Sequence, residues 1–542
     1  MSSGPNPPVS LLVIETGASA TMPGVAGPLL PDWPACDRHA GRLLCAVGAC
    51  QPGRPAVTTA AGEWTYGRLI SAVRAVASRL AGHSNFHRGG RVVLLLPNSP
   101  EYVAVFYGVL LAGGVIVPLP PKTEAGVLQK IIESTEATVI VTRANVVQSR
   151  ADLNGLPAEV LDLAPISPVG PPQATSFDET TGDELAAIFF TAGSTGIPKG
   201  VMLSHGNLIS NARAIQGYLP IGREDRPLCV LPFHHAFGNS VLQSHLLAGA
   251  NLVLDGQTTF PETIIKSLHR HECTSFSAVP DLFRSLLERS SLGQTGLPSV
   301  RYMAVAGGAL RHELALEVAR RIAPAEFFVM YGQTEATARL AFVPPRHLAE
   351  LPAGTIGRAI PGVTLDVVDE EGVPVAAGEI GELRAKGPGL MLGYWRDPVA
   401  TDERIRDGWL YTGDLATRDS QGWFIHRGRR NALVKIAGFR VHPADLEDFA
   451  IRRLPVSQAA AVAFESPDVG TRLALYVKPA ESGTDLAVSE MVARCRNELP
   501  RHLVPNFIQI VDELPLNHAL KIDRPLLTKL AEQETARRRA LA

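Results

Sequence analysis

The stretch Thr191-Ala-Gly-Ser-Thr-Gly-Ile-Pro-Lys199-Gly200 determines how the fold of this 542-residue chain is interpreted. It follows Leu185-Ala-Ala-Ile-Phe-Phe190, an apolar run typical of a buried strand. Its glycines allow backbone N–H groups to turn toward an anion, its hydroxyl side chains are further donors, and its lysine is a mobile positive charge. The residues concerned are Thr191, Gly193, Ser194, Thr195, Gly196 and Lys199. The spacing is not that of a P-loop, so the stretch predicts either a loop that binds polyphosphate or a solvated turn.

Segments further along the chain favour the phosphate-binding loop. They are Tyr331-Gly-Gln-Thr-Glu335, Tyr411-Thr-Gly-Asp414, Gly428-Arg429 leading to Val434-Lys435-Ile-Ala-Gly438, and Leu514-Pro-Leu-Asn-His-Ala-Leu-Lys521. With these segments in this order, the chain from roughly residue 40 onward resembles the AMP-forming adenylating enzymes. That family includes acyl-CoA synthetases, adenylation domains of peptide synthetases and firefly-type luciferases. The resemblance implies that ATP activates a carboxylic acid to an acyl-adenylate, with release of pyrophosphate.

The pattern of elements predicts two units of different class. Between residues 85 and 425, helical patterns alternate with short apolar runs such as Val92-Val-Leu-Leu-Leu96, which predicts βαβ units. From about residue 430, helical patterns at 446–454 and 486–499 surround two strand patterns, as in a small α+β unit. The predicted fold is a large N-terminal α/β domain of stacked parallel or mixed sheets with helices, plus a small α+β C-terminal lid.

Three segments follow from this pattern. Residues 1–37 are rich in Pro, Gly and Ser and are expected to be a poorly ordered extension. Residues 38–430 are expected to form the nucleotide- and acid-binding domain. Residues 431–542 are expected to form a mobile C-terminal domain, which by the resemblance rotates between two half-reactions about a hinge at Asn431.

Composition is that of a large enzyme without a charged macromolecular partner. The formal net charge of -2 gives no reason to expect nucleic-acid binding, and no run reaches the ~18 apolar residues of a transmembrane segment. The six cysteines have neither CxxC pairing nor metal-ligand spacing, so reduced thiols are expected. We therefore expect a cytoplasmic protein, and the sequence leaves its oligomeric state open.

The resemblance assigns the chemistry of the first half-reaction. Attack of a carboxylate on the α-phosphorus of ATP needs alignment and charge neutralisation rather than a protein nucleophile. Glu335 is the expected Mg²⁺ ligand, because Mg²⁺ bound to phosphates prefers one or two carboxylates, and Thr334 is expected to donate to the α-phosphate. Outside such a motif, a single Glu in a turn would be interpreted as a solvated carboxylate.

Further residues are expected to bind the nucleotide. Asp414 has an acceptor-only carboxylate suited to two ribose hydroxyls, and Arg429 has a fork suited to ribose or phosphate oxygens. The alternative is a surface Asp–Arg pair. By resemblance, the AMP-binding set also includes Tyr331, Gly332, Gly307 and Gly308. For the two glycines after 306, a plain turn at a strand end is the alternative.

The C-terminal residues are assigned by resemblance alone. Lys521 is expected to reach the adenylation site and bridge the attacking carboxylate and the phosphate. Lys435 is expected to act in the thioester-forming orientation, with Gly438 lining the passage for a pantetheine arm; an exposed strand lysine is the alternative. Leu520 stands where the family usually has Gly, and Asn431 stands where it usually has Asp.

The expected acid pocket is apolar or small. Leu231-Pro-Phe-His-His235-Ala-Phe-Gly238 resembles the acyl-CoA synthetase version of the segment that floors this pocket. It lacks the Asp that would hold an α-amino group, so an amino acid substrate is not expected. The lining residues are expected to be His235, Phe237, Ala306, Gly307 and Ala309. They favour a fatty or simple aryl acid, although a lone His in this setting can also be a packed core residue.

The acceptor of the acyl group is expected by resemblance to be coenzyme A. A carrier-protein phosphopantetheine is the alternative, since the reacting arm is the same in both. A third possibility is a non-catalytic paralogue that only binds AMP or ATP, and the two departures at 431 and 520 are what suggest it.

Overall fold

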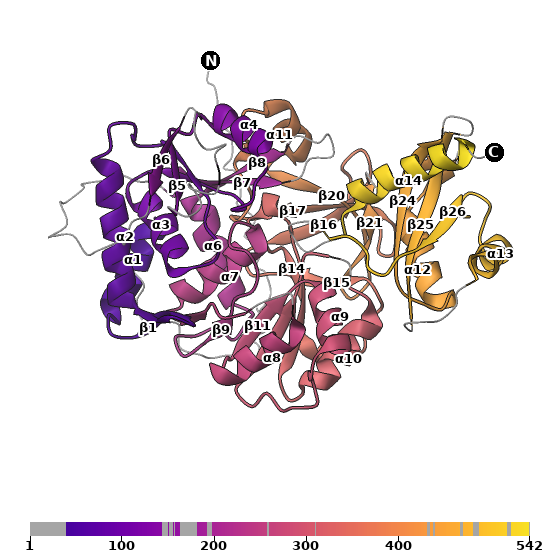
Figure 1. Cartoon of the computed structure of the whole chain (residues 1–542), viewed down its shortest axis with the longest axis horizontal. Helices are drawn as coiled ribbons and strands as arrows, with labels where there is room; N and C mark the ends of the chain where they lie inside the picture. Colours follow the sequence, from indigo (N-terminus) through magenta and orange to yellow (C-terminus); the bar gives the residue numbers. More distant parts are fainter. Residues whose placement is uncertain are drawn as a thin grey trace, which may run out of the picture.

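The computed structural model describes residues 39–143, 150, 156, 158–162, 182–191, 198–256, 260–308, 310–430, 434–436, 439–466, 470–480, 487–516 and 522–540. A large body contains the chain up to residue 430, and a smaller body beside it contains the part that follows (Figure 1). The predicted extension 1–37 lies outside the described residues. The predicted division after residue 430 stays a prediction, because it borders 431–433, which also lie outside them.

The larger sheet of the large body contains both parallel and antiparallel strand pairs. Its described strands are β1 (Pro55–Thr59), β2 (Gly62–Thr65), β9 (Pro227–Leu228), β10 (Leu252–Val253), β11 (Ser275–Ala278), β12 (Tyr302–Val305), β13 (Glu326–Tyr331), β14 (Ala341–Val343), β15 (Thr355–Ala359), β16 (Thr364–Val368), β17 (Gly381–Lys386), β19 (Ile405–Arg406), β20 (Trp409–Arg418) and β21 (Phe424–Arg429). They lie in the order β16-β17-β20-β21-β15-β14-β13-β12-β11-β9-β10-β1-β2, and β19 pairs with β20. The pairs from β1 through β10, β9, β11 and β12 to β13 are parallel, and those from β13 through β14, β15, β21, β20 and β17 to β16 are antiparallel.

The second sheet carries the predicted phosphate-binding stretch. Its described strands are β3 (Arg91–Leu94), β4 (Val115–Pro118), β5 (Val139–Thr142), β6 (Glu159–Asp162), β7 (Leu185–Thr191), β8 (Lys199–Ser204) and β18 (Gly393–Tyr394). Their order is β18-β8-β7-β4-β3-β5-β6. The predicted buried strand is β7, and β8 returns antiparallel beside it with Thr191 opposite Lys199. The short strand β18 pairs with β8 and so brings a distant part of the sequence next to this hairpin.

Helices pack on and between these sheets. In the large body they are α1 (Ala40–Cys50), α2 (Tyr66–Ala81), α3 (Pro100–Leu111), α4 (Ala125–Thr135), α6 (His205–Gln216), α7 (Ala236–Leu247), α8 (Pro261–Arg270), α9 (Pro280–Arg289), α10 (His312–Ile322) and α11 (Pro398–Arg404), with 3-10 turns η2 (Thr334–Ala336) and η3 (Pro345–His347). Helix α6 begins with a capping box, in which Ser204 accepts from the N–H of Asn207 and Asn207 accepts from the N–H of Ser204. Ten of the twelve residues of α3 are buried, as expected for a helix that is apolar on all sides.

The smaller body has the predicted α+β composition. Its elements are β22 (Val434–Ile436), β23 (Phe439–Val441), α12 (Pro443–Arg453), β24 (Val456–Ser466), β25 (Gly470–Pro479), α13 (Val488–Glu498), β26 (Phe507–Ile510) and α14 (Arg524–Ala540). The long strands β24 and β25 pair antiparallel, and β26 joins β25 in parallel. Arg289 of the large body and Glu513 of the smaller one form an ion pair at 2.5 Å.

Two findings concern the predicted absence of disulfides and membrane spans. The five cysteines in the described part of the chain are free thiols. Within that part, no helix has the length and apolar character needed to cross a bilayer.

Candidate active site

An antiparallel strand pair brings Asp414 and Arg429 together. Asp414 lies on β20 directly opposite Arg429 on β21, so the register of the pair makes them cross-strand neighbours. The Asp414 side chain is buried, and its Oδ1 lies 3.0 Å from Nε of Arg429 and 3.5 Å from Nε2 of His426. Its Oδ2 accepts a 2.5 Å hydrogen bond from the Tyr331 hydroxyl at the end of β13. Three strands of the large sheet therefore supply one polar cluster.

The cluster keeps Asp414 ionised. Burial alone would raise the pKa of Asp414, but the nearby His426 ring, the charge of Arg429 and the hydrogen bond from the Tyr331 hydroxyl outweigh it and lower that pKa. The ion pair with Arg429 is not aligned as a hydrogen bond, so the buried Oδ1 is still available to a further donor. A buried, charged acceptor with this spare capacity is suited to a sugar hydroxyl.

The loop after β13 places Glu335 near this cluster. Gly332 is needed at the start of the loop, because a Cβ there would come within 1.8 Å of the Ala338 carbonyl oxygen. Thr334 and Glu335 follow in the 3-10 turn η2, and the carbonyl of Glu335 accepts from the N–H of Met391 at 2.8 Å. The charge of Asp414 is the main cause that raises the pKa of Arg429, and the Glu335 charge acts in the same direction.

The Glu335 carboxylate is held by a residue that the motifs did not include. Its Oε1 accepts a 2.8 Å hydrogen bond from the hydroxyl of Tyr394 on β18. Burial and the Glu335 charge raise the pKa of Tyr394, so the hydroxyl stays a proton donor. One oxygen of Glu335, the expected Mg²⁺ ligand, is therefore hydrogen-bonded to the protein.

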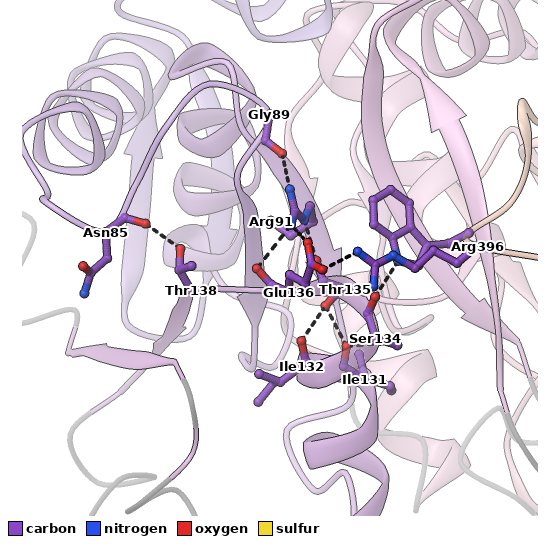
Figure 2. A network of polar contacts seen from close by, with 11 residues as sticks. Asn85, Gly89, Arg91, Ile131, Ile132, Ser134, Thr135, Glu136, Thr138 and Arg396 are labelled. Atoms are coloured by element: carbon purple, nitrogen blue, oxygen red, sulfur yellow. Dashed lines mark hydrogen bonds and ion pairs between the residues drawn. The ribbon is translucent and has the colours of Figure 1, made fainter.

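Strand β18 is in turn anchored to α4. Trp395 donates its ring N–H to the carbonyl of Ser134 at 2.8 Å, and Arg396 pairs with Glu136 just beyond the C-terminal end of α4. Figure 2 shows Arg396 reaching Glu136, with Arg91 of β3 on the same carboxylate from the other side at 3.2 Å. This network fixes the segment that presents Tyr394.

Lys199 lies beside the same tyrosine. Its Nζ is 5.0 Å from the centre of the Tyr394 ring and 3.8 Å from Oδ2 of Asp397. Tyr394 therefore contacts both predicted residues: Lys199 of the phosphate loop lies over its ring, and Glu335, the predicted metal ligand, accepts from its hydroxyl. Of the residues predicted to bind phosphate in that stretch, Thr191 is also described; Gly193, Ser194, Thr195 and Gly196 lie outside the described residues.

The predicted acid-pocket residues come from two elements. His235 is the N-cap of α7, Phe237 lies in the first turn of that helix, and Ala306 directly follows β12. Phe237 and Ala306 pack in one apolar cluster. Gly307 has φ of 88°, a conformation that favours glycine, and Gly308 follows it. Ala309 lies outside the described residues.

Glu335 is the carboxylate that the motif assigns to Mg²⁺. No group of three or more His, Cys, Asp or Glu side chains that could hold a metal ion occurs in that part of the chain. Glu335 fits an ion that takes one protein carboxylate and completes its shell with phosphate oxygens and water. The Tyr394 hydroxyl bonds to Oε1 of Glu335, and Oε2 is the second carboxylate oxygen of the same side chain.

Of the residues predicted to act from the C-terminal part of the chain, Lys435 lies within the described residues. Lys435 lies on β22, which pairs with β23. Asn431, Gly438, Leu520 and Lys521 lie outside the described residues. Leu516 and Ile522, which flank the segment with Lys521, pair as an antiparallel bridge.

Residues 46–395 match the sequence pattern of the family described as AMP-binding enzyme, and residues 445–521 match that of the AMP-binding enzyme C-terminal domain. The chain is 30% identical to a long-chain-fatty-acid–CoA ligase of Salmonella typhimurium, in an alignment that covers 87% of this chain and 91% of the relative. It is 29% identical to a feruloyl-CoA synthase of an Amycolatopsis species, over 91% of this chain and 97% of the relative.

Solved structures agree with the sequence comparison. ATP-bound MatB from Rhodopseudomonas palustris is 26% identical and superimposes with a TM-score of 0.80, over 91% of this chain and 99% of that one. The o-succinylbenzoate CoA synthetase of Bacillus subtilis, in complex with its acyl-adenylate intermediate, is 25% identical with a TM-score of 0.78, over 90% of this chain and 97% of that one. The predicted fold class is thus confirmed, and the chain belongs to the AMP-binding enzyme family, the AMP-forming adenylating enzymes that its motifs resemble.

Proposed function

We propose that this protein is an AMP-forming acid–thiol ligase. It converts an aliphatic or aryl carboxylic acid and ATP to an acyl-adenylate and pyrophosphate, and then transfers the acyl group to the thiol of coenzyme A. The observation that carries the proposal is the meeting of Asp414, Tyr331 and Arg429 next to the loop that bears Glu335. The ligases among its relatives support the choice of coenzyme A as acceptor.

In the first step, a carboxylate oxygen of the acid attacks the α-phosphorus and pyrophosphate leaves. Asp414 accepts hydrogen bonds from the ribose, and Arg429 holds ribose or phosphate oxygens. Lys199 and the loop before it hold the terminal phosphates, and Thr334 donates to the α-phosphate. These groups act by alignment and charge, because the reaction needs no protein nucleophile.

Glu335 is the protein ligand proposed for Mg²⁺, which supplies charge neutralisation on the phosphates. Lys521 stabilises the charge that develops between the carboxylate and the phosphate during adenylation. In the second step, the thiol attacks the acyl carbon, the carbon–oxygen bond to phosphate breaks, and AMP leaves. Lys435 and Gly438 are the residues proposed to serve that step. The free thiols support a reducing compartment, the cytoplasm, as its place.

Exchange of labelled pyrophosphate into ATP tests the first step. The proposal predicts exchange that depends on both a carboxylic acid and Mg²⁺ and that proceeds without any thiol. Addition of coenzyme A should then yield a thioester and AMP, whereas a holo-carrier protein should not. Absence of exchange with every acid of a panel of aliphatic and aryl acids would favour the non-catalytic alternative, and acylation of the carrier alone would favour the carrier-protein alternative.

A further inference from the structure

Arg339 is a buried arginine inside the apolar wall of the proposed acid site. Arg339 is only 4% exposed, and its guanidinium carbon lies 4.0 Å from the centre of the Phe237 ring. Phe237 packs in the same apolar cluster as Ala306 and Tyr218. A positive charge therefore lies against residues expected to surround the acid.

This charge has no carboxylate partner within the described residues. The ion pairs of the described part of the chain include none with Arg339, and its Nε is buried without a hydrogen-bond acceptor. Burial lowers the pKa of Arg339, and the Tyr218 hydroxyl is the group that acts in the opposite direction. By contrast, Arg384 also stacks on an aromatic ring but pairs with Asp366 at 2.9 Å. A buried guanidinium without a carboxylate is costly unless an anion from outside the protein completes it.

The backbone of Arg339 is held in the same loop as Glu335, the proposed Mg²⁺ ligand. Arg339 lies on the loop that also carries Glu335, between β13 and β14. Thr337, between them, has φ of 62°, which is strained for a β-branched residue, and its hydroxyl donates to the carbonyl of Gly389 at 2.7 Å. Asn211 of α6 also donates to the carbonyl of Arg339 at 3.2 Å. A single loop, held by these hydrogen bonds, therefore carries both Glu335 and Arg339.

We propose that Arg339 binds a second anionic group of the acid, so that the substrate is a dicarboxylic acid of which one carboxylate is adenylated and the other is held by the guanidinium. The inference rests on the proposed function and narrows its substrate class. The planar fork of arginine matches a carboxylate in two hydrogen bonds, and the Phe237 and Tyr218 rings exclude water from that pair. A plain alkyl tail in this place would leave the charge buried and unpaired.

Matched acids test this directly in pyrophosphate exchange. Each pair has the same carbon skeleton, once with a single terminal carboxylate and once with a carboxylate at both ends. The wild type should prefer the dicarboxylate by on the order of 10²-fold in kcat/KM at the best chain length, because the unpaired group penalises the other acid. Arg339→Met should abolish or reverse that preference while leaving the KM for ATP unchanged. Arg339→Lys keeps the charge without the fork and should retain only part of the preference.

Two controls separate recognition from a structural role. Arg358 is an exposed arginine stacked on Trp423 at 4.1 Å, and Arg358→Met should leave the preference among acids unchanged. The melting temperature is measured for every variant with and without the preferred dicarboxylate. The dicarboxylate should raise the melting temperature of the wild type and not that of Arg339→Met, whose own melting temperature should be no lower than that of the wild type.

The outcomes distinguish this inference from the proposed function. If the wild type adenylates monocarboxylates as well as their dicarboxylate partners, or if Arg339→Met keeps the wild-type preference, the inference is wrong and the ligase proposal stands. If no acid supports exchange, the ligase proposal fails and the inference fails with it.

Discussion

The Tyr394 hydroxyl donates to Oε1 of Glu335 at 2.8 Å, and so joins the strand beside the phosphate hairpin to the loop with the proposed metal ligand. The same ring lies 5.0 Å from Nζ of Lys199. Because Tyr394 contacts both residues, we expect it to position the side chains proposed for the phosphates and the metal.

Tyr394→Phe should weaken Mg²⁺ use without changing the choice of acid. Loss of one hydrogen bond that orients a metal ligand typically costs about 10-fold in metal affinity. The Mg²⁺ concentration for half-maximal pyrophosphate exchange should rise by that factor, and Glu335→Gln should raise it further. Tyr476→Phe removes another buried hydroxyl, which donates to the Leu527 carbonyl in the smaller body, and should not alter the titration. An unchanged Mg²⁺ titration in Tyr394→Phe would contradict the positioning role.

Asp414→Asn should impair ATP binding selectively. It removes the charge that pairs with Arg429 and the acceptor proposed for the ribose, so the KM for ATP should rise about 10–100-fold while the KM for the acid stays constant. Asp366→Asn breaks a similar pair, with Arg384 at 2.9 Å, on the outer strand of the same sheet. Equal effects of the two substitutions on the KM for ATP would mean that Asp414 only stabilises the sheet.

The lowered pKa of Asp414 also predicts how the stability of the fold changes with pH. A carboxyl group whose pKa is lower in the folded state stabilises the fold above its ordinary pKa, and this contribution disappears as the pH falls through the folded-state value. The stability difference between wild type and Asp414→Asn, measured by denaturant unfolding, should therefore shrink on acidification below about pH 4 and not on going from about pH 8 to pH 6.

Lys521→Ala should impair adenylation and spare thioester formation. Removal of one preorganised charge of this kind typically costs about 10²–10³ in rate. Pyrophosphate exchange should fall by that factor, whereas thiolysis of a supplied acyl-adenylate should remain near the wild-type rate, and Lys521→Arg should not rescue exchange. Lys529→Ala, at an exposed lysine of α14, is the matched control. Equal loss of both half-reactions would count against the assignment.

Asn431→Pro should separate the two half-reactions. Proline fixes φ near -65° and removes an N–H, so a residue that must change conformation during domain rotation is trapped in one state. One half-reaction should stay near its normal rate and the other should fall by orders of magnitude, with Asn431→Ala as the control. Small, equal effects on both steps would place the hinge elsewhere.

Much of the fold was predictable because its signals are local. The strand expected at 185–190 is Leu185–Thr191, and the helix expected at 446–454 is Pro443–Arg453, since apolar runs and helical periodicity lie within one element. The order of strands in the sheets was not predictable. Strand β18 has two residues, and its partner β8 lies far away in the sequence.

Candidate-site residues that lie in a sequence motif could be predicted, whereas residues brought to the site only by packing could not. Asp414 and Arg429 belong to separate motifs, and only the register of β20 and β21 shows that they meet. Tyr394, His426 and Arg339 have no pattern that marks them, because their roles depend on partners from other strands. An arginine in an apolar wall could be found only from its burial and its missing carboxylate.

The most direct test of the central claim follows the oxygen atoms of the acid. In the proposed mechanism, a carboxylate oxygen forms the bond to the α-phosphorus and stays on that phosphorus when the thiol displaces AMP. With an acid labelled with ¹⁸O in its carboxylate, mass spectrometry should find one labelled oxygen in AMP and none in pyrophosphate. Label in inorganic phosphate, or AMP that is unlabelled while thioester forms, would contradict attack at the α-phosphorus and with it the mechanism proposed for this site.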